Sequence, residues 1–494
     1  MDYRDNLLSK AKWREPVPAA NGSPIMWRDY TQDDFLRQYY PSSHRIFDEA
    51  VYPNIYRSIR EEIYDEQGNP TGHFNVRYYV EKVPRFAFAY QQLIVTKQLC
   101  HLTGNDIQFD LNTPTESEKT KEAFQLFKDD WQEKGQNEAF YFLCKGVKIT
   151  GDAAYVGYLN DGVFNWKVLS YFDGDTLYPH YDARGKLDCF ARKYTRDNNG
   201  VKIECLEVWD NRFLYRLHAP LEGERTFSLS LVNNTVEVEG YTFDDFKAHG
   251  FPFIPIAYHR DPKGACWLPS QNSIDEYEVQ FSQMAQNNKV FGVPTLYLQG
   301  DNIAAQHDID GSIRILEMGP DDHAGYLSAQ SASDSYMKEL EELKVQIYEQ
   351  SFIVKTPELK SGDLPAAALK ILYSPAYEKA KIDADEYNGA LQQMVNIFSY
   401  GDGIERESTT TFASLPMVAW IRPYAHLSES AIMADLAIGV QNGFVSRKTA
   451  SERAWFYTTD NEQQRLAEQA KEEEKMDLLA QYEKDNAEGI ELDQ

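Results

Sequence analysis

Apolar residues recur at intervals of three and four through much of the first 150 positions of the chain. This spacing places them on one face of an α-helix, so region 1–150 is predicted to be mostly helical. The stretch 31–68, which mixes charged and aromatic residues at helical spacing, is assigned to the same class. An apolar helix within 84–104 is expected to end at Gly104, and 117–151 is expected to form one or two amphipathic helices.

The pattern changes near Gly151, where short runs of aromatic and β-branched residues alternate with turn-forming residues. The turn residues, mostly Asn, Asp and Gly, stand at 160–162, 183–185, 198–200 and 210–211. Regular turns between such runs are typical of antiparallel hairpins. The sequence therefore predicts a region of antiparallel strands from 151 to about 262.

Two later segments, 273–291 and 333–353, each carry one apolar stripe on an otherwise polar helical pattern. In the first segment the stripe follows a capping-box pattern formed by Ser273 and Glu276. The stripe residues are Ile274, Tyr277, Phe281 and Met284 in the first segment, and Tyr336, Leu340, Leu343 and Ile347 in the second. The turn-rich insert between the two helices has two strand candidates, 295–299 and 312–318.

A short loop with Lys, acidic residues, Gly and Pro separates the second of these helices from the next helical pattern. That next helix, or pair of helices, is interrupted at Ser374-Pro375, since proline either kinks a helix or occupies its first turn. The helical pattern runs to Tyr400 and is expected to stop at Gly401-Asp402-Gly403. One strand is then expected within 409–423. Helices follow, one ending at Gly443 and others beginning at Ser446 and near Asp460.

Composition narrows the class of protein. The 494 residues are 42% hydrophobic and 13% aromatic, which is enough for packed cores and excludes global disorder. The net charge of −27 argues against tight binding to phosphate backbones, because that affinity comes from Lys and Arg. The five Cys are widely spaced and form no CxxC, so buried free thiols are expected. Neither a signal peptide nor a membrane span is expected.

The sequence contains none of the motifs GxxxxGK[ST], HExxH, GxSxG or GxGxxG. Acidic clusters are the remaining candidates for chemistry, and they are Asp173, Asp175 and Asp182, then Asp308 and Asp310, then Asp321 and Asp322. Paired carboxylates serve glycosidases, and converging ones hold metals in nucleases. These clusters, however, fall at turns, where Asp and Gly are favoured for backbone reasons. We therefore expect no catalytic residue, no metal site and no cofactor.

The order of these elements resembles that of the portal proteins, or head–tail connectors, of tailed bacteriophages. Three segments carry the resemblance, and they lie at 251–290, 360–382 and 427–475. The first is a strand with an Ile-Pro step that leads into a helix, and the second is a Ser-Gly loop that leads into an Ala-Leu-Lys helix. The third is the most specific, with N-G-F-V-S-R-x-T followed by D-N-E-Q and an acidic helix.

The resemblance implies an α+β portal fold with antiparallel hairpins in a wing and with long stem and kinked helices. Its parts would be the wing at 1–265, the first stem helix at 266–291, the clip at 292–332, the second stem helix at 333–353, the tunnel loop, kinked helix and wing strand at 354–423, and a helical crown with an acidic tail at 424–494. The stripe residues would then belong to the stem. The DNA-channel residues of the tunnel loop would be Lys355, Glu358, Lys360, Ser361, Gly362, Asp363 and Lys370.

The resemblance also implies a structural protein, not an enzyme. Family members form rings, typically of twelve subunits, around a channel for double-stranded DNA at one capsid vertex. The implied partners are other copies of the chain, DNA bound without sequence specificity, the major capsid and scaffolding proteins, the terminase and a neck adaptor, with no membrane. The implied location is the virion, after assembly in the host bacterial cytoplasm.

Two alternatives stay open at the level of the sequence. The first is an acidic carbohydrate hydrolase that uses a carboxylate pair among Asp173, Asp175 and Asp182. The second is a different structural adaptor of a phage particle. Assembly into a closed ring with an axial hole distinguishes the portal from both.

Overall fold

The computed structural model shows a mixed fold in which every strand pairing is antiparallel within the described ranges. Those ranges are 13–17, 26–64, 67, 70–112, 118–198, 200–220, 229–232, 235–238, 240–291, 295–299, 304–307, 313–317, 323–327, 333–355, 368, 371–406, 412, 415–424, 429–444 and 450. The chain divides into one unit of Met1–Lys355 with Pro375–Tyr424 and another of Thr356–Ser374 with Ala425–Gln494. The predicted α+β class is confirmed at this level.

The N-terminal part of the first unit is less helical than predicted. Strand β1 (Trp13–Val17) pairs with β2 (Met26–Tyr30), and α1 (Gln32–Tyr39) begins at a capping box between Thr31 and Asp34. The next two strands, β3 (Ile55–Tyr64) and β4 (Pro70–Glu81), form a long hairpin, so the helical prediction for 31–68 is wrong over β3.

The wrong helical prediction for β3 has an identifiable source. Ile55, Ile59 and Ile63 recur every four residues, which imitates one face of a helix. The aromatic and β-branched residues of both segments favour strands, and pairing with β4 decided the outcome.

Three helices then form as predicted: α2 (Tyr90–Thr103), α3 (Glu118–Glu133) and α4 (Gln136–Thr150). Gly104 ends α2 with right-handed backbone angles, so it does not act as a left-handed cap. Gly151 ends α4 with a φ of 85°, a conformation that glycine adopts without strain. Helix α4 is buried along most of its length and lies at the centre of the main hydrophobic core.

The predicted region of antiparallel strands is confirmed. One sheet has the order β15-β6-β7, and the other has the order β14-β11-β10-β9-β8. The bounds are β6 (Asp152–Asn160), β7 (Val163–Ser170), β8 (Thr176–Tyr181), β9 (Leu187–Asn198), β10 (Val201–Trp209), β11 (Phe213–Pro220), β14 (Thr242–Ala248) and β15 (Ile256–Arg260), with a further pair of β12 (Leu229–Val232) and β13 (Thr235–Val238). The connections of the consecutive hairpins fall at the predicted turns, and Asp161 and Gly162 both have positive φ between β6 and β7. An apolar cluster that includes Val156, Phe190 and Trp209 joins the two sheets.

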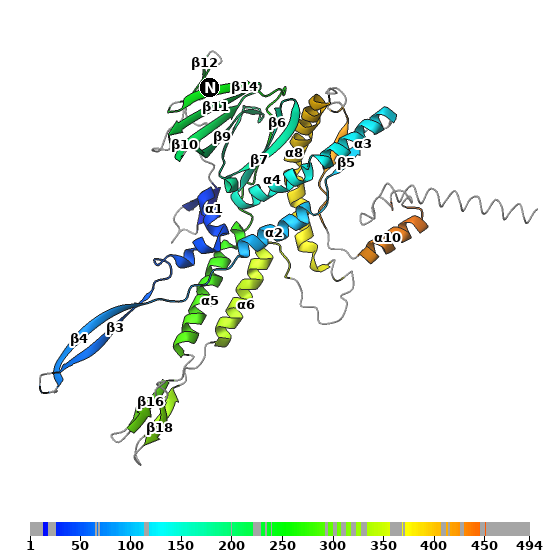
Figure 1. Cartoon of the computed structure of the whole chain (residues 1–494). Helices are drawn as coiled ribbons and strands as arrows, with labels where there is room; N and C mark the ends of the chain where they lie inside the picture. The colour runs from blue at the N-terminus through cyan, green and yellow to red at the C-terminus, as the bar shows by residue number, and fades with distance from the viewer. Residues whose placement is uncertain are drawn as a thin grey trace, which may run out of the picture. The chain divides into compact units, whose positions relative to one another are not determined.

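Helices α5 (Gln271–Phe291) and α6 (Ser333–Gln350) lie side by side in the first unit (Figure 1). The insert between them has four described strands, not the two predicted. Strand β16 (Thr295–Gln299) pairs with β19 (His323–Leu327), and β17 (Ala304–His307) pairs with β18 (Ile313–Glu317). The two missed strands contain Ala, Gln, His and Gly, which have little strand preference alone, so pairing defines them.

Helix α8 (Ser374–Glu405) is continuous, with Pro375 in its first turn. The prediction that it stops at Gly401 is wrong, because the helix runs through both glycines to Glu405. Strand β20 (Met417–Trp420) pairs with β5 (Gln108–Leu111). In the second unit, α10 (Glu429–Gln441) is followed by Gly443, as predicted, whereas the helix starts predicted at Ser446 and Asp460 lie outside the described residues.

All five cysteines are free, in agreement with the sequence. Cys144, Cys189 and Cys205 are buried as expected, and Cys266 is half-buried. Cys100 is exposed, which corrects the expectation that every thiol would be buried.

Candidate functional site

The apolar stripes of α5 and α6 face the main hydrophobic core. Ile347 is fully buried, Leu340 and Tyr277 are nearly so, and Tyr336 is half-buried. Phe281, Met284 and Leu343 are partly buried and pack against the same core. The ring of Phe88 lies 5.2 Å from that of Tyr277 and 5.1 Å from that of Phe281. Ile274 is fully buried in this core as well, so the structure brings seven of the eight stripe residues into one packed cluster, with Tyr336 at its margin.

The outer face of α6 is acidic. Four exposed glutamates lie on this helix, and they are Glu339, Glu341, Glu342 and Glu349. Among the described residues, none of these glutamates forms an ion pair with the exposed Lys338. Two apolar side chains, Met337 and Val345, are also about half exposed there. This face would repel phosphate and offers apolar surface to another protein chain.

A buried carboxylate anchors α5 to the N-terminal segments. Glu278, 1% exposed, accepts a hydrogen bond from the backbone N–H of Phe88 at 2.8 Å. The same oxygen lies 2.7 Å from Nδ1 of His44, whose Nε2 lies 2.7 Å from the carbonyl oxygen of Gln38. The sequence offered no periodic signal for this cluster, since its members are far apart along the chain.

Hydrogen bonds fix the C-terminal end of α6, just before the candidate channel loop begins. Phe352 has a φ of 56°, in the left-handed region that favours glycine, and the N–H of Ile353 donates to the carbonyl of Tyr348 at 3.0 Å. Gln98 on α2 donates to the carbonyl of Ser351 at 2.8 Å. Of the predicted channel residues, Lys355 is exposed just after this end. The others, Glu358, Lys360, Ser361, Gly362, Asp363 and Lys370, lie outside the described residues.

A buried ion pair links α8 to α4. Nζ of Lys148 on α4 lies 2.7 Å from Asp383 and 3.0 Å from the side-chain oxygen of Gln98, and Lys379 also pairs with Asp383. Burial opposes both charges, but the attraction of Asp383 outweighs it and leaves the pKa of Lys148 above its usual value. For Asp383, the two lysines outweigh burial and leave the pKa below its usual value.

The C-terminal end of α8 has a second ionic cluster. Nζ of Lys134 lies 2.6 Å from both Asp402 and Glu405, and Glu405 also accepts from the N–H of Phe164 at 2.8 Å. Arg406 pairs with Asp130 on α3. Sequence reasoning missed both clusters. The only local signal was a charged residue, such as Lys148, within an otherwise apolar helical run.

The three carboxylates of the hydrolase alternative each bind a different partner and do not act as a pair. Asp175, 3% exposed, accepts from Nε of Arg192 at 2.7 Å, and burial raises its pKa against the pull of that arginine. Asp173 accepts from the hydroxyl of Ser170 at 2.6 Å. Asp182 accepts from the backbone N–H groups of Arg184 and Lys186 at 2.8 and 2.9 Å, which is turn chemistry.

The insert's acidic residues, Asp308, Asp310, Asp321 and Asp322, lie outside the described residues. In the part of the chain that the structure describes, no three His, Cys, Asp or Glu side chains gather as a metal site requires. Among the helices of the same ranges, none combines the length and apolar character that crossing a bilayer demands.

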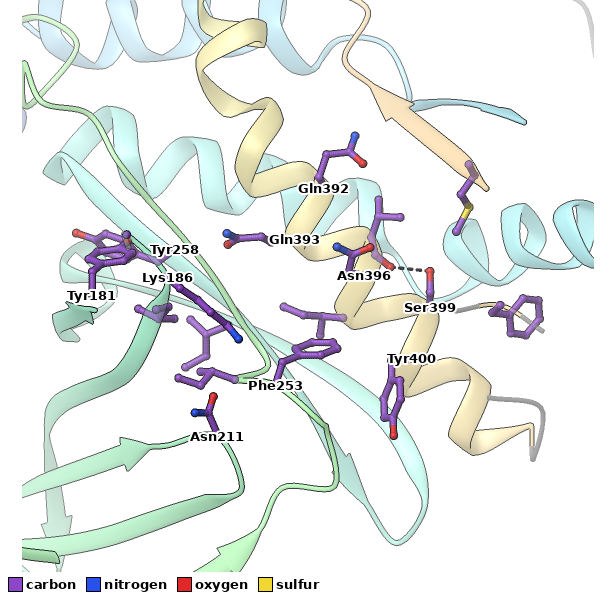
Figure 2. A pocket seen from close by; sticks show the side chains of 18 of the residues that line it. Tyr181, Lys186, Asn211, Phe253, Tyr258, Gln392, Gln393, Asn396, Ser399 and Tyr400 are labelled. Atoms are coloured by element: carbon purple, nitrogen blue, oxygen red, sulfur yellow. Dashed lines mark hydrogen bonds between the residues drawn. The ribbon is translucent and has the colours of Figure 1, made fainter. Parts of the chain in front are cut away.

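A cavity of about 550 Å³ lies between α8 and the turns of the two sheets (Figure 2). Helix α8 lines it with amides and hydroxyls, from Gln392, Gln393, Asn396, Ser399 and Tyr400. The facing turns and strands contribute Tyr181, Lys186, Asn211, Phe253 and Tyr258. Among the described residues that line the cavity, Lys186 is the charged one, and these residues include no carboxylate and no nucleophile–base pair of the kind that hydrolysis requires.

Comparison with known proteins gives a family match over most of the chain. Residues 23–476 match the family model described as phage portal protein, SPP1 Gp6-like. No curated protein matches the sequence.

Two solved structures show a distant likeness. A chain in "Virion of native gene transfer agent (GTA) particle" is 10% identical, with a TM-score of 0.36. A chain in "Neck of empty GTA particle computed with C6 symmetry" is 11% identical, with a TM-score of 0.35. Each alignment covers 73% of this chain and 86% of the other. Both TM-scores are below 0.5, so the family match is the finding that bears on function.

Proposed function

This chain belongs to the phage portal protein family, SPP1 Gp6-like, and from that membership we propose that it assembles into a closed ring around a DNA channel at one capsid vertex. Its role is that of a portal, a structural component of the phage virion and not an enzyme, as the sequence predicted. The family match also supports self-assembly together with capsid and neck components. The hydrolase alternative has no support from the match or from the separated carboxylates.

The proposal divides the chain into the parts of a portal. The wing is 1–265, the stem is α5 and α6 with the strands between them as the clip, and 354–423 holds the tunnel loop, the kinked helix and a wing strand. The crown with its acidic tail is 424–494. The packed inner stripes and acidic outer face of α6 support the stem assignment, because such a helix can pack on one side and line a channel on the other.

The proposed ring has about twelve subunits and surrounds double-stranded DNA that it contacts without sequence specificity. Cyclic symmetry turns one exposed charge per chain into a ring of charges. The glutamates of α6 would repel phosphate and let DNA slide, while Lys355 and Lys360 would guide it. We further propose the terminase, the major capsid and scaffolding proteins and a neck adaptor as partners, and the host bacterial cytoplasm as the place of assembly.

The family match carries this proposal, and the native mass of the purified protein tests it. Twelve copies of 56.9 kDa correspond to about 0.7 MDa in a closed cyclic assembly. We expect particles near that mass, with a central hole in electron micrographs. A chain that stays monomeric or dimeric, both alone and with the capsid and scaffolding proteins, would contradict the ring.

The channel residues are tested separately from the ring. Lys355→Ala with Lys360→Ala is expected to leave ring formation unchanged and to lower the fraction of DNA-filled particles in a packaging assay. Lys381→Ala, at an exposed lysine of α8, is the matched control. Normal DNA filling in the double variant would show that the guiding role is dispensable.

A further inference from the structure

The hairpin of β3 and β4 has two faces of different chemistry. Residues that pair directly across an antiparallel ribbon share a face, and alternate residues point to opposite faces. The pairs Tyr56 with Val80 and Ser58 with Tyr78 place these side chains on one face. Phe74 and Val76 follow on β4 by alternation, and they pair with Glu62 and Arg60 of β3, so this face also carries one charge of each sign. We call the set of Tyr56, Phe74, Val76, Tyr78 and Val80 the tyrosine face.

The other face has fewer large apolar residues and more charges, with Arg57, Glu61, Arg77 and Glu81 beside Ile59 and Tyr79. The pairs Arg57 with Tyr79, Ile59 with Arg77, and Glu61 with Asn75 belong to it. We call this set the arginine face. Arg57 and Glu81, whose side chains lie 2.5 Å apart, form an ion pair on it near the base of the hairpin.

The large apolar side chains of the tyrosine face are exposed to solvent. Tyr78 is 77% exposed, Tyr56 is 74%, Phe74 is 52%, Val80 is 50% and Val76 is 39%. Together they present apolar surface on the order of 500 Å². That is as large as the largest apolar patch of an ordinary monomer, and such patches often serve to bind another surface. It is also more than half of what one partner contributes to a standard interface.

The base of the hairpin is fixed to the first unit, so the ribbon can act as an arm. Lys289 on α5 pairs with Glu81 at 3.2 Å. Arg85 donates to the carbonyl of Tyr52 at 2.8 Å, which joins the two chain segments that enter and leave the ribbon. A two-stranded ribbon is marginally stable by itself in water. A surface that packs against the tyrosine face would therefore stabilise the ribbon.

We propose that the tyrosine face packs on the neighbouring copy of this chain, as an arm that links adjacent subunits. This inference rests on the proposed ring. It is favoured by charge, because the two strands carry three Arg and three Glu and are neutral, whereas the whole chain carries −27. A neutral, aromatic arm can approach an acidic copy without the repulsion that most of the surface would meet.

The contact is head-to-tail, since the arm meets a different surface on the next copy. Such a contact closes into a ring when the rotation between subunits allows it. Each subunit would then give one arm and receive one. Loss of the arm contact weakens every interface of the ring at once.

A photo-crosslinking side chain at position 78 tests the contact directly. Tyr78→p-benzoylphenylalanine in the full chain places the probe at the most exposed residue of the tyrosine face. Irradiation of the purified protein is expected to give covalent dimers and a ladder of higher oligomers on a denaturing gel. The same probe in Tyr79→p-benzoylphenylalanine, on the arginine face, is the matched control and is expected to give far less product. Equal or no product at position 78 overturns the proposal.

A pair of double variants measures the energetic role of the face. Phe74→Ser with Tyr78→Ser is expected to raise the protein concentration needed for assembly by about tenfold or more, as loss of aromatic interface residues does. Ile59→Ser with Tyr79→Ser removes exposed apolar residues from the arginine face and is expected to leave that concentration nearly unchanged. Identical assembly of both double variants and the parent would contradict the proposal.

The outcomes separate this inference from the proposed function. Normal rings without cross-links at position 78 would overturn the arm and leave the ring intact. Covalent dimers without rings would support the contact between copies and overturn the ring. Cross-links formed only with added capsid or scaffolding protein would assign the tyrosine face to that partner and overturn the arm.

Discussion

At the scale of single residues, charged groups inside the protein decide how α8 is held. Lys148 and Asp383 are both nearly inaccessible to solvent, and each keeps its charge through the other. A buried pair of this kind adds little net stability compared with an apolar pair. Removal of one partner is costly, because the other charge stays buried without compensation.

Lys148→Met is therefore expected to lower the free energy of unfolding by about 3–5 kcal/mol. Adding Asp383→Leu should restore much of that loss, because no buried charge then lacks its partner. Urea unfolding followed by tryptophan fluorescence measures both. Lys381→Met, at an exposed position of α8, is the control and should change stability by less than about 0.5 kcal/mol. A small effect of Lys148→Met would show that Lys379 alone compensates Asp383.

Asp152 gives a pH-dependent prediction. Burial raises its pKa to about 7, against opposing hydrogen bonds from Tyr258 and Gln32 and the charge of Arg260. The unfolded chain has a carboxyl pKa of about 3.9, so the native state binds the extra proton between the two values. This contribution to stability is complete below about pH 4 and is lost as the pH rises toward 7.

Asp152→Asn should remove the loss of stability that the parent protein shows as the pH rises toward 7. The melting temperature of the parent relative to the variant is expected to fall between pH 5 and pH 8, because only the parent must release a proton from a buried carboxyl. Thermal unfolding at several pH values measures the difference. A constant difference over this range would contradict a raised pKa for Asp152.

At the scale of elements, two glycines let α8 pack closely against the sheet that contains β6 and β7. A Cβ on Gly157 of β6 would collide with Ile397 of α8, and a Cβ on Gly401 of α8 would collide with Phe164 of β7. Both glycines thus permit helix and sheet to approach more closely than other residues would allow. This packing also explains why α8 continues through Gly401 although glycine disfavours helices.

Two glycines of α8 provide a matched test. Gly401→Ala is expected to destabilise the protein despite alanine's higher helix propensity, because its methyl group would meet the Phe164 ring. Gly389→Ala has open space and is expected to stabilise the protein by up to about 1 kcal/mol. Chemical unfolding of both variants measures the opposite signs. Stabilisation by both substitutions would show that the contact at Gly401 relaxes freely.

At the scale of the whole molecule, charge opposes the association of copies. Each chain carries −27, and charged surfaces repel over a Debye length that falls from about 30 Å at 0.01 M salt to about 8 Å at 0.15 M. The fraction of protein in rings is therefore expected to rise with salt over this range. Native mass measurements across a NaCl series test this, with sucrose as an uncharged control. A ring fraction that falls as salt rises would indicate that ion pairs dominate the subunit contacts.

The sequence by itself determined the features that rest on local signals. Stripes at helical spacing located α2 to α6, and Asn, Asp and Gly located the turns of the sheets. The same stripes selected Tyr277, Leu340 and Ile347 as buried residues of α5 and α6. Three ordered segments indicated the portal family, which the match over 23–476 confirmed. Each of these signals lies within a window of neighbouring residues, where propensity and periodicity act.

Only the tertiary structure decided the features that depend on partners distant in sequence. Ile55, Ile59 and Ile63 suit a helix, and pairing with β4 made them part of a strand. Lys148 meets Asp383 across 235 positions, a contact that no local pattern predicts. The exposed tyrosine face likewise appears only once the register of β3 and β4 is known. The physical reason is that strand pairing, burial and ion pairing gain free energy from contacts between segments, and these contacts override weak local preferences.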